Sequence, residues 1–343
     1  MIVKRGRKIV KNNSKAKKSV VKKSSKKLVK SVKKKSLQKK PIKKKKNSKK
    51  VWTRKDTQKL IKDIKSLKIQ GATNVAKTAV TILHNEMLID NSSANINKII
   101  GELTKTRPTE PMMRNAIKFY LHLLKKERMY PEQAYNKVLH YFEYSKKRLA
   151  DFGAQLIESG KTYFTHCHSS DVIAIFKKAR ETKLFRVFNT ETRPLYQGRI
   201  TATELAENGI PVVHFVDSGA RMAVKESTIV FLGSDAITKD GEAYNKIGSE
   251  MIAELASNRN VPIYICTASW KLDPYSFFGF DEKIEQRHEE EIWKTPPSGV
   301  IINNYAFEKI NLKYIKGIIS ELGILTPKKF VKETKKLHKW MFE

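Results

Sequence analysis

Three short segments of the chain carry side chains that move protons or hold anions. Residues 165–169 place a thiol, Cys167, directly after an apolar run. Residues 233–235 place a carboxylic acid, Asp235, after a second apolar run. Residues 245–248 add an amide and an ammonium group at a polar corner. A base, an acid and anion donors on one scaffold favour proton-transfer chemistry on a phosphorylated substrate.

Cys167 lies in a predicted strand-to-helix turn, because a helical pattern starts near Asp171. A helix N-terminus stabilises a thiolate and so lowers the thiol pKa. The alternative is a small buried core residue, which is a common role of free Cys. The flanking His166 and His168 favour the functional interpretation. A metal site is disfavoured, since in extended backbone the two histidines point to one side and Cys167 to the other.

Asp235 follows the second apolar run, residues 229–232, after Gly233 and Ser234. A carboxyl group at the end of a strand, beside an apolar sheet, gains a raised pKa and suits general acid catalysis. The alternative is a turn or cap Asp. Residues 238–241 predict a tight turn that places Gly241 at a position needing positive φ.

Phosphate contacts are predicted in both halves of the chain. Asn245 and Lys246 open a helix-like stretch, where backbone N–H groups and an ammonium group bind anions. Lys271 follows the last clear strand as a second cation, although most lysines are simply solvated. Gly71 either lets backbone approach a ligand closely or merely separates two helices. The predicted substrate-binding residues are Gln70, Gly71, Ala72, Thr73, Arg107, Ser169, Asn245, Lys246 and Lys271.

Two patterns divide the rest of the chain. Residues 51–155 show apolar side chains at helical spacing and predict a helical N-terminal domain. Residues 156–343 alternate short runs rich in β-branched and aromatic residues with helix-like segments, which predicts a buried parallel sheet covered by helices. Ligands bind beyond the carboxyl ends of such strands, where the candidate residues stand. The predicted strands are 163–165, 185–188, 211–216, 228–232 and 262–266, and the helices include 171–180, 201–208 and 245–258.

The charge is concentrated at the N-terminus. The chain carries 69 basic and 34 acidic side chains, and residues 1–50 hold 24 of the basic ones with no Asp or Glu. Lysine clusters without an apolar period predict a disordered tail. Such a tail binds polyanions, most simply RNA, through counterion release, or is a solvated extension without a dedicated partner. It has no aromatic residue on which a base could stack.

Cysteine content and hydropathy indicate the compartment. The chain has two cysteines, Cys167 and Cys266. Two cysteines do not indicate a disulfide framework, and this count fits a reducing cytoplasm. No apolar run approaches the roughly 18 residues that span a bilayer. The basic start is not followed by an apolar segment, so a targeting peptide is not expected.

Taken in order, the motifs resemble those of one superfamily. It contains ribose 1,5-bisphosphate isomerase, methylthioribose 1-phosphate isomerase and the regulatory subunits of translation initiation factor 2B. The resemblance covers about residues 55 to 343. The motifs that carry it are Gln70-Gly71-Ala72, Arg107-Pro108-Thr109, Thr165-His166-Cys167-His168-Ser169, Thr190-Glu191-Thr192-Arg193-Pro194 with Gln197-Gly198, Gly233-Ser234-Asp235, Asn245-Lys246-Ile247-Gly248, Asn304-Tyr305-Ala306-Phe307-Glu308 and Gly323-Ile324-Leu325-Thr326-Pro327.

This resemblance implies a Rossmann-like C-terminal domain and a dimer, or a trimer of dimers. It implies an aldose–ketose isomerase, because the isomerases carry a Cys and an Asp at the positions of Cys167 and Asp235, and the initiation-factor subunits generally lack that pair. The residues around Cys167, together with the Arg-Pro-Thr segment, are most similar to those of the archaeal ribose 1,5-bisphosphate isomerase. The resemblance implies no required cofactor, AMP as an activator, and a role in nucleotide salvage.

Two positions depart from the isomerase pattern. Gln70 stands where these enzymes usually have Arg, and Ser170 stands where the bisphosphate enzyme usually has Lys. Both changes remove a cation from the phosphate sites. Two alternatives therefore stay open: methylthioribose 1-phosphate as substrate, and a regulatory subunit without catalysis.

Overall fold

A computed structural model describes residues 52–108, 110–280 and 284–343, and residues 52–343 form one compact unit. The tail predicted over residues 1–50 lies outside the described residues, as do Val51 and Thr109. Among the described residues, no helix is long and apolar enough to cross a membrane. The predicted division of the unit near residue 155 stays a prediction.

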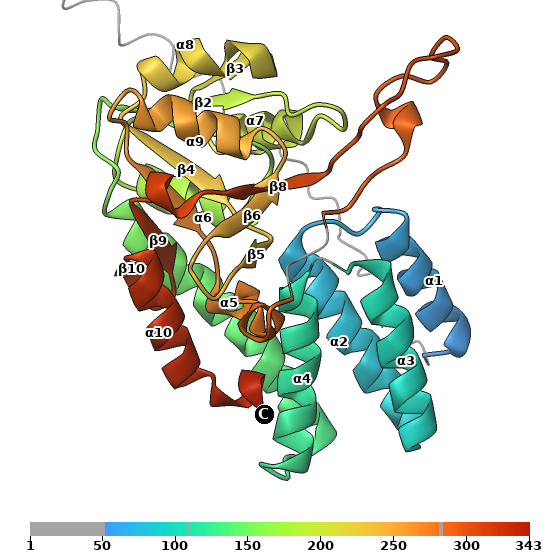
Figure 1. The fold of residues 1–343 in the computed structure, drawn as a ribbon. Helices are drawn as coiled ribbons and strands as arrows, with labels where there is room; N and C mark the ends of the chain where they lie inside the picture. The colour runs from blue at the N-terminus through green and yellow to red at the C-terminus, as the bar shows by residue number, and fades with distance from the viewer. Residues whose placement is uncertain (1–51, 109, 281–283) are drawn as a thin grey trace, which may run out of the picture. The chain divides into compact units, whose positions relative to one another are not determined.

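The first part of the unit consists of five helices (Figure 1): α1 (Arg54–Lys65), α2 (Ala72–Ile89), α3 (Ser93–Thr106), α4 (Pro111–Lys125) and α5 (Pro131–Ala154). Local sequence sets where they begin. Thr53 and Asp56 form a capping box at the start of α1. Pro111 and Pro131 occupy the first turns of α4 and α5, where a missing N–H costs nothing. The predicted helical part is therefore confirmed.

A seven-stranded sheet follows, in the order β10-β9-β7-β4-β1-β2-β3. All pairings are parallel except that of β10 with β9. Helices α5, α6 and α7 pack on one face and α8, α9 and α10 on the other (Figure 1). The mostly parallel, Rossmann-like α/β fold is confirmed. The strands are β1 (Thr162–Thr165), β2 (Arg186–Thr190), β3 (Val212–Phe215), β4 (Ile229–Gly233), β7 (Ile263–Cys266), β9 (Gly317–Ser320) and β10 (Gly323–Leu325), and the helices are α6 (Ser170–Arg180), α7 (Gln197–Glu207), α8 (Ala220–Lys225), α9 (Ser249–Ser257) and α10 (Pro327–Leu337).

A second, three-stranded sheet is absent from the sequence prediction. It consists of β5 (Ala236–Ile237), β6 (Ala243–Lys246) and β8 (Phe307–Ile310), and both pairings are antiparallel. The expected helix over 245–258 is wrong at its start. Asn245 and Lys246 belong to β6, and α9 begins only after Gly248. The φ of Gly248 is +99°, in the left-handed region, so the chain turns there between the strand and the helix. The predicted positive φ of Gly241 is confirmed at +90°.

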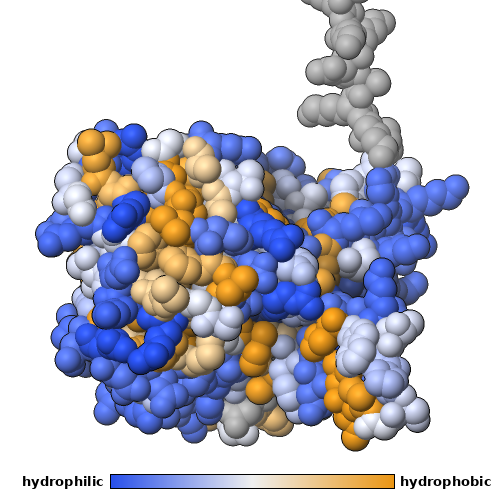
Figure 2. Space-filling view, turned by 90° about the horizontal axis from the view of Figure 1, so that it is seen from above, coloured by the Kyte–Doolittle hydropathy of each residue, from blue (hydrophilic) through white to orange (hydrophobic). Residues whose placement is uncertain are grey.

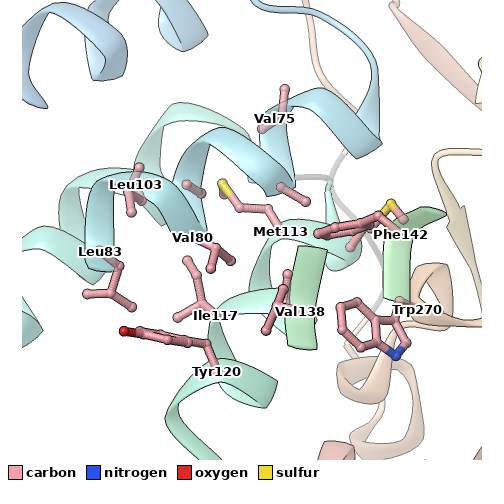
Figure 3. Packing of buried hydrophobic residues seen from close by; sticks show 14 of the residues in the cluster. Val75, Val80, Leu83, Leu103, Met113, Ile117, Tyr120, Val138, Phe142 and Trp270 are labelled. Carbon is pink, nitrogen blue, oxygen red and sulfur yellow. The ribbon is translucent and has the colours of Figure 1, made fainter. Parts of the chain in front are cut away.

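The five-helix part shares its core with the segment after β7. Trp270, in the short helix η2 (Ser269–Lys271), is fully buried among the side chains of α2, α4 and α5 (Figure 3). Its ring stacks on Tyr141 with centroids 3.8 Å apart. The Asn115 amide donates to the carbonyls of Trp270 and Leu272, at 2.8 and 2.9 Å. These contacts fix the backbone on both sides of Lys271.

Candidate active site

One cavity collects every residue that the sequence predicted for the site. It lies beyond the carboxyl ends of β1, β4 and β7, as expected for a parallel sheet. The second sheet and the start of α2 form its other walls. The predicted residues that line it are Gln70, Gly71, Ala72, Thr73, Arg107, Cys167, Ser169, Asp235, Asn245, Lys246 and Lys271.

The backbone of Cys167 adopts a conformation that is rare outside glycine. Its φ is +66°, in the left-handed region. Two threonines hold it there: the Cys167 N–H donates to Thr192 Oγ1 at 3.0 Å, and the Thr201 hydroxyl donates to the Cys167 carbonyl at 2.8 Å. Strained backbone that its surroundings enforce is common where a reactive side chain must be aimed.

The predicted lowering of the Cys167 pKa is wrong. Burial raises the pKa of the Cys167 thiol to about 12, although the nearby Lys246 ammonium opposes this shift. The helix dipole of α6 does not prevail, because desolvation of a thiolate outweighs a partial positive charge. At neutral pH the thiol is therefore protonated in nearly all molecules.

The pKa of Asp235 is shifted upward, the direction expected for a general acid. Burial raises the pKa of its carboxyl group, while Lys271 and Arg107 pull it down. Its backbone N–H donates to the Tyr244 carbonyl at 2.8 Å, which ties the end of β4 to β6. A carboxyl group with a raised pKa keeps its proton closer to neutral pH and can donate it to a substrate oxygen.

His166, beside Cys167, has a structural role. His166 is buried between Thr190 Oγ1 at 2.6 Å and the Ile247 carbonyl at 2.9 Å. Because a carbonyl only accepts, Nε2 carries the proton and Nδ1 accepts from Thr190. Burial lowers the pKa of His166, which keeps the ring neutral. The hydrogen bond to Ile247 connects the end of β1 to the turn before α9. The ring also lies within 3.1 Å of where a Cβ on Gly248 would stand, so the turn packs directly on it.

Lys246 reaches the cavity from a strand, not from the predicted helix start. It forms no ion pair with any described carboxylate. Burial lowers its pKa, and the Cys167 thiolate would raise it. Asn245 is fixed beside it, because its amide donates to Ser249 Oγ at 2.8 Å. An ammonium group without a carboxylate partner can bind a phosphate and stabilise a thiolate.

Lys271 is held by a buried ion pair. Its Nζ lies 3.0 Å from Asp171 Oδ2, and both side chains are more than nine-tenths buried. Burial would lower the pKa of Lys271, but the Asp171 and Asp235 carboxylates raise it, so the ammonium stays charged. Two N–H···O bonds, from the Ser269 backbone to both oxygens of Glu321, anchor the same short helix at 3.2 and 3.1 Å.

Arg107 faces Glu110, an acidic residue that sequence reasoning missed. Arg107 Nη2 lies 2.6 Å from Glu110 Oε1, yet both carboxylate oxygens and Arg107 Nε lack a well-oriented hydrogen-bond partner. Burial raises the pKa of Glu110 to about 7, although Arg107 pulls it down. Buried polar groups without partners, in a cavity wall, indicate a ligand-facing pair.

Two helix N-termini line the cavity. Gly71 precedes α2 with φ of +81° and no side-chain cap, so the first N–H groups of that helix stay available. Ser169 caps α6 and packs on β4, where a Cβ at Gly233 would come within 2.7 Å of it. Helix N-termini favour anions, and of these two only the α2 N-terminus lacks a side-chain cap.

Further residues of the wall were not predicted as site residues from the sequence. Gln197, Glu285 and Arg287 line the cavity, and Gln197 Oε1 and Glu285 Oε2 have no hydrogen-bond partner. Only Gln197 stands in a motif that the sequence singles out. Glu285 and Arg287 flank Gln286, which forms an antiparallel bridge with Tyr305 just before β8, and β8 in turn pairs with β6. Within the described residues, no group of three or more His, Cys, Asp or Glu has metal-binding geometry.

The family model described as the initiation factor 2 subunit family matches residues 64–327. Ribose 1,5-bisphosphate isomerase of Thermococcus kodakarensis is 34% identical over 297 residues, covering 80% of this chain and 92% of its own. A crystal structure of translation initiation factor eIF-2B from Pyrococcus horikoshii has a TM-score of 0.71 at 29% identity, covering 80% and 98%. The 5-methylthioribose 1-phosphate isomerase of the same organism has a TM-score of 0.65 at 22% identity, covering 82% and 88%, a likeness of fold alone.

The chain belongs to the initiation factor 2 subunit family.

Proposed function

We propose that this protein converts ribose 1,5-bisphosphate to ribulose 1,5-bisphosphate by acid–base catalysis. The chain is an isomerase, and its relatives named ribose 1,5-bisphosphate isomerase indicate a sugar phosphate as substrate. The observation that carries the finer proposal is one cavity holding Cys167, Asp235 and two helix N-termini. Two helix N-termini at one cavity suit a substrate with a phosphate at each end.

In the proposed reaction, Asp235 begins protonated and donates to the ring oxygen, which opens the sugar. The Cys167 thiolate takes the proton from C2 and leaves an enediol phosphate. The proton on the C2 hydroxyl then returns to Asp235, and the Cys167 thiol delivers its proton to C1. Atoms balance: C2 becomes a ketone, C1 gains a hydrogen, and both side chains regain their starting forms.

The raised thiol pKa makes the active protonation state a minority form. Because Asp235 must be protonated and Cys167 deprotonated, Lys246 has a specific role in this scheme: its ammonium is the largest influence that lowers the thiol pKa. Arg107, Asn245, Lys271 and the 70–73 segment would hold the phosphates, and Ser169 would position the sugar. No cofactor takes part in the scheme, and AMP is expected to activate by resemblance alone.

The test is turnover of ribose 1,5-bisphosphate, with and without AMP, by wild type and Cys167→Ser. The proposal requires turnover by wild type and its loss in the variant, since a hydroxyl is a far weaker base than a thiolate. Ser169→Ala is the matched control: it keeps the thiol and removes a neighbouring hydroxyl, so it should raise KM more than it lowers kcat.

A second substrate, methylthioribose 1-phosphate, is favoured by the charge balance of the cavity. Arg107, Lys271 and Arg287 each face a carboxylate, which leaves Lys246 as the one cavity cation of the described residues without one. Fewer available cations suit a single phosphate. Comparing kcat/KM for the two substrates decides between them, and binding to initiation factor 2 without turnover of either would favour a regulatory subunit.

Oligomer formation is a further part of the proposal. Figure 2 shows apolar side chains gathered among charged ones over the region of α8, α9 and β3. Val216 and Met222 are 58% and 69% exposed there. Exposed apolar patches mark interaction sites, and a second copy in a homodimer or hexamer would cover this one. Light scattering of the purified chain tests it, since a monomeric mass would contradict it.

A further inference from the structure

A basic and aromatic surface lies away from the active site, around the helix α10. A hollow there is lined by four lysines, Lys239, Lys328, Lys332 and Lys335, together with the ring of Phe277. Lys328, Lys332 and Lys335 recur at i, i+4 and i+7, so they share one face of α10. None of the four forms an ion pair with a described carboxylate, and Asp240 is the one acid of the lining.

The same surface exposes aromatic rings. Phe277 lies in the short helix η3 (Pro274–Phe278), and the rings that follow it, Phe278 and Phe280, are 68% and 66% exposed. Within the described residues, neither ring contacts another aromatic ring or a cation. Two exposed rings two residues apart form a local apolar patch, and such patches mark interaction sites.

Specific contacts join the lysines to the aromatic loop. Lys335 Nζ lies 4.4 Å from the centroid of the Phe277 ring. The Lys239 N–H donates to Ser276 Oγ at 2.8 Å, and the Phe280 N–H donates to the Tyr275 carbonyl at 3.3 Å, which folds the loop back on itself. The lysines of α10 and the segment that carries the exposed rings therefore meet at Phe277, and the surface is defined by residues 239, 275–280 and 328–335.

We propose that this surface binds single-stranded nucleic acid, most simply RNA. Lysines that face no carboxylate suit a phosphate backbone, and exposed rings suit unpaired bases, which stack on aromatic side chains. A duplex keeps its bases stacked inside and cannot use the rings. The surface supplies the stacking platform that the lysine-rich tail lacks. It acts independently of the isomerase site, with which it shares no lining residue.

The test measures binding of labelled oligouridylate to the full-length chain by fluorescence anisotropy, over a series of salt concentrations. Phe278→Ala/Phe280→Ala should weaken single-strand binding about tenfold or more and leave duplex binding unchanged. That loss should persist at high salt, where the contribution of the basic tail is screened. Phe278→Trp/Phe280→Trp should retain binding, which separates loss of stacking from loss of fold.

Two lysine variants complete the design. Lys332→Ala/Lys335→Ala should reduce the salt dependence, by roughly 0.7 in the log–log slope for each phosphate that a lysine no longer neutralises. Lys59→Ala/Lys62→Ala removes the same charge from exposed positions of α1 and should change nothing. Wild-type affinity in the Phe278→Ala/Phe280→Ala variant would overturn the proposal. So would a drop in molecular mass of that variant by light scattering, because a second copy of the chain would then cover the rings.

Discussion

At Cys167, desolvation competes with a positive charge. The thiol is half-buried in the cavity wall after β1, and burial raises its pKa to about 12 against the influence of Lys246. Sequence alone predicts the opposite sign, because it shows the helix that follows but not the walls that close around the sulfur. The proposed base is thus present as thiolate in a small fraction of molecules, and the site must act through that fraction.

Alkylation of Cys167 by iodoacetamide measures this directly, since only the thiolate reacts. With a pKa near 12, the rate should rise about tenfold for each pH unit between neutral and strongly alkaline pH. Lys246→Met should slow the reaction at every pH by raising the pKa further. Mass spectrometry of the peptide that contains Cys167 gives the rate of alkylation. The Cys167→Ser variant shows how much of the total alkylation occurs at Cys266. A rate that levels off near neutral pH would show that the thiol is already ionised there.

Glu110 gives the site a second pH dependence. Its pKa of about 7 means that the carboxyl group is neutral below that pH and ionised above it. The ionised form competes with substrate phosphate for Arg107, so KM should rise as pH passes upward through about 7. Glu110→Gln should abolish that rise and leave kcat nearly unchanged. The exposed surface substitution Glu226→Gln is the control and should behave as wild type, whereas a KM of Glu110→Gln that still rises with pH would assign the effect elsewhere.

At the scale of elements, two glycines let loops approach strands. A Cβ at Gly198 would stand 1.7 Å from the Thr190 carbonyl oxygen. The start of α7 can therefore pack against the end of β2 only if residue 198 has no side chain. A Cβ at Gly233 would meet Ser169. These close approaches bring the loops after β1, β2 and β4 against one another around the cavity.

Gly198→Ala should therefore destabilise the fold by about 3 kcal/mol, because the clash is with backbone that cannot move aside. Gly101→Ala is the matched control: no atom lies within 4 Å of the added Cβ, and the position is inside helix α3. Alanine there should be neutral or stabilising by up to about 1 kcal/mol. Urea denaturation measures both, and equal stabilities of the two variants would contradict the packing described.

Sequence predicts the elements that repeat a period and misses those that depend on distant partners. Apolar periodicity indicates five of the seven strands of the main sheet, β1, β2, β3, β4 and β7, and the helices 171–180 and 201–208, but it misses β9 and β10. The strand holding Asn245 and Lys246 resembles a helix start in the sequence, because its pairing with residues 307–310 lies far along the chain. All predicted site residues line one cavity, since motifs after strands of a parallel sheet converge. Glu110 and Arg287 carry no such signal, because only the closed cavity shows what they face.

At the scale of the whole molecule, charge separates two roles. Residues 1–50 hold 24 of the 69 basic side chains, whereas the cavity pairs most of its cations with carboxylates. We therefore assign the proposed nonspecific attraction to polyanions to the tail, and the proposed selectivity for a small phosphate to the cavity. The compact unit of residues 52–343 contains the whole described site.

Deleting residues 1–50 should lower RNA affinity most at low salt and make the remaining binding less salt-dependent, because the counterions released by the tail no longer contribute. Isomerase kcat/KM should stay within about twofold, since all the residues proposed for catalysis and substrate binding belong to the compact unit of residues 52–343. Binding titrations and steady-state kinetics on the same preparation measure both. Loss of isomerase activity on deletion would mean that the tail takes part in catalysis.

The central claim is that Cys167 and Asp235 isomerise a sugar phosphate in this cavity. The most direct measurement is turnover of ribose 1,5-bisphosphate by wild type, Cys167→Ser and Asp235→Asn. The account predicts formation of ribulose 1,5-bisphosphate by wild type and a loss of at least about a thousandfold in kcat in either variant. Full activity in Cys167→Ser, or no turnover of either sugar phosphate by wild type, would contradict it.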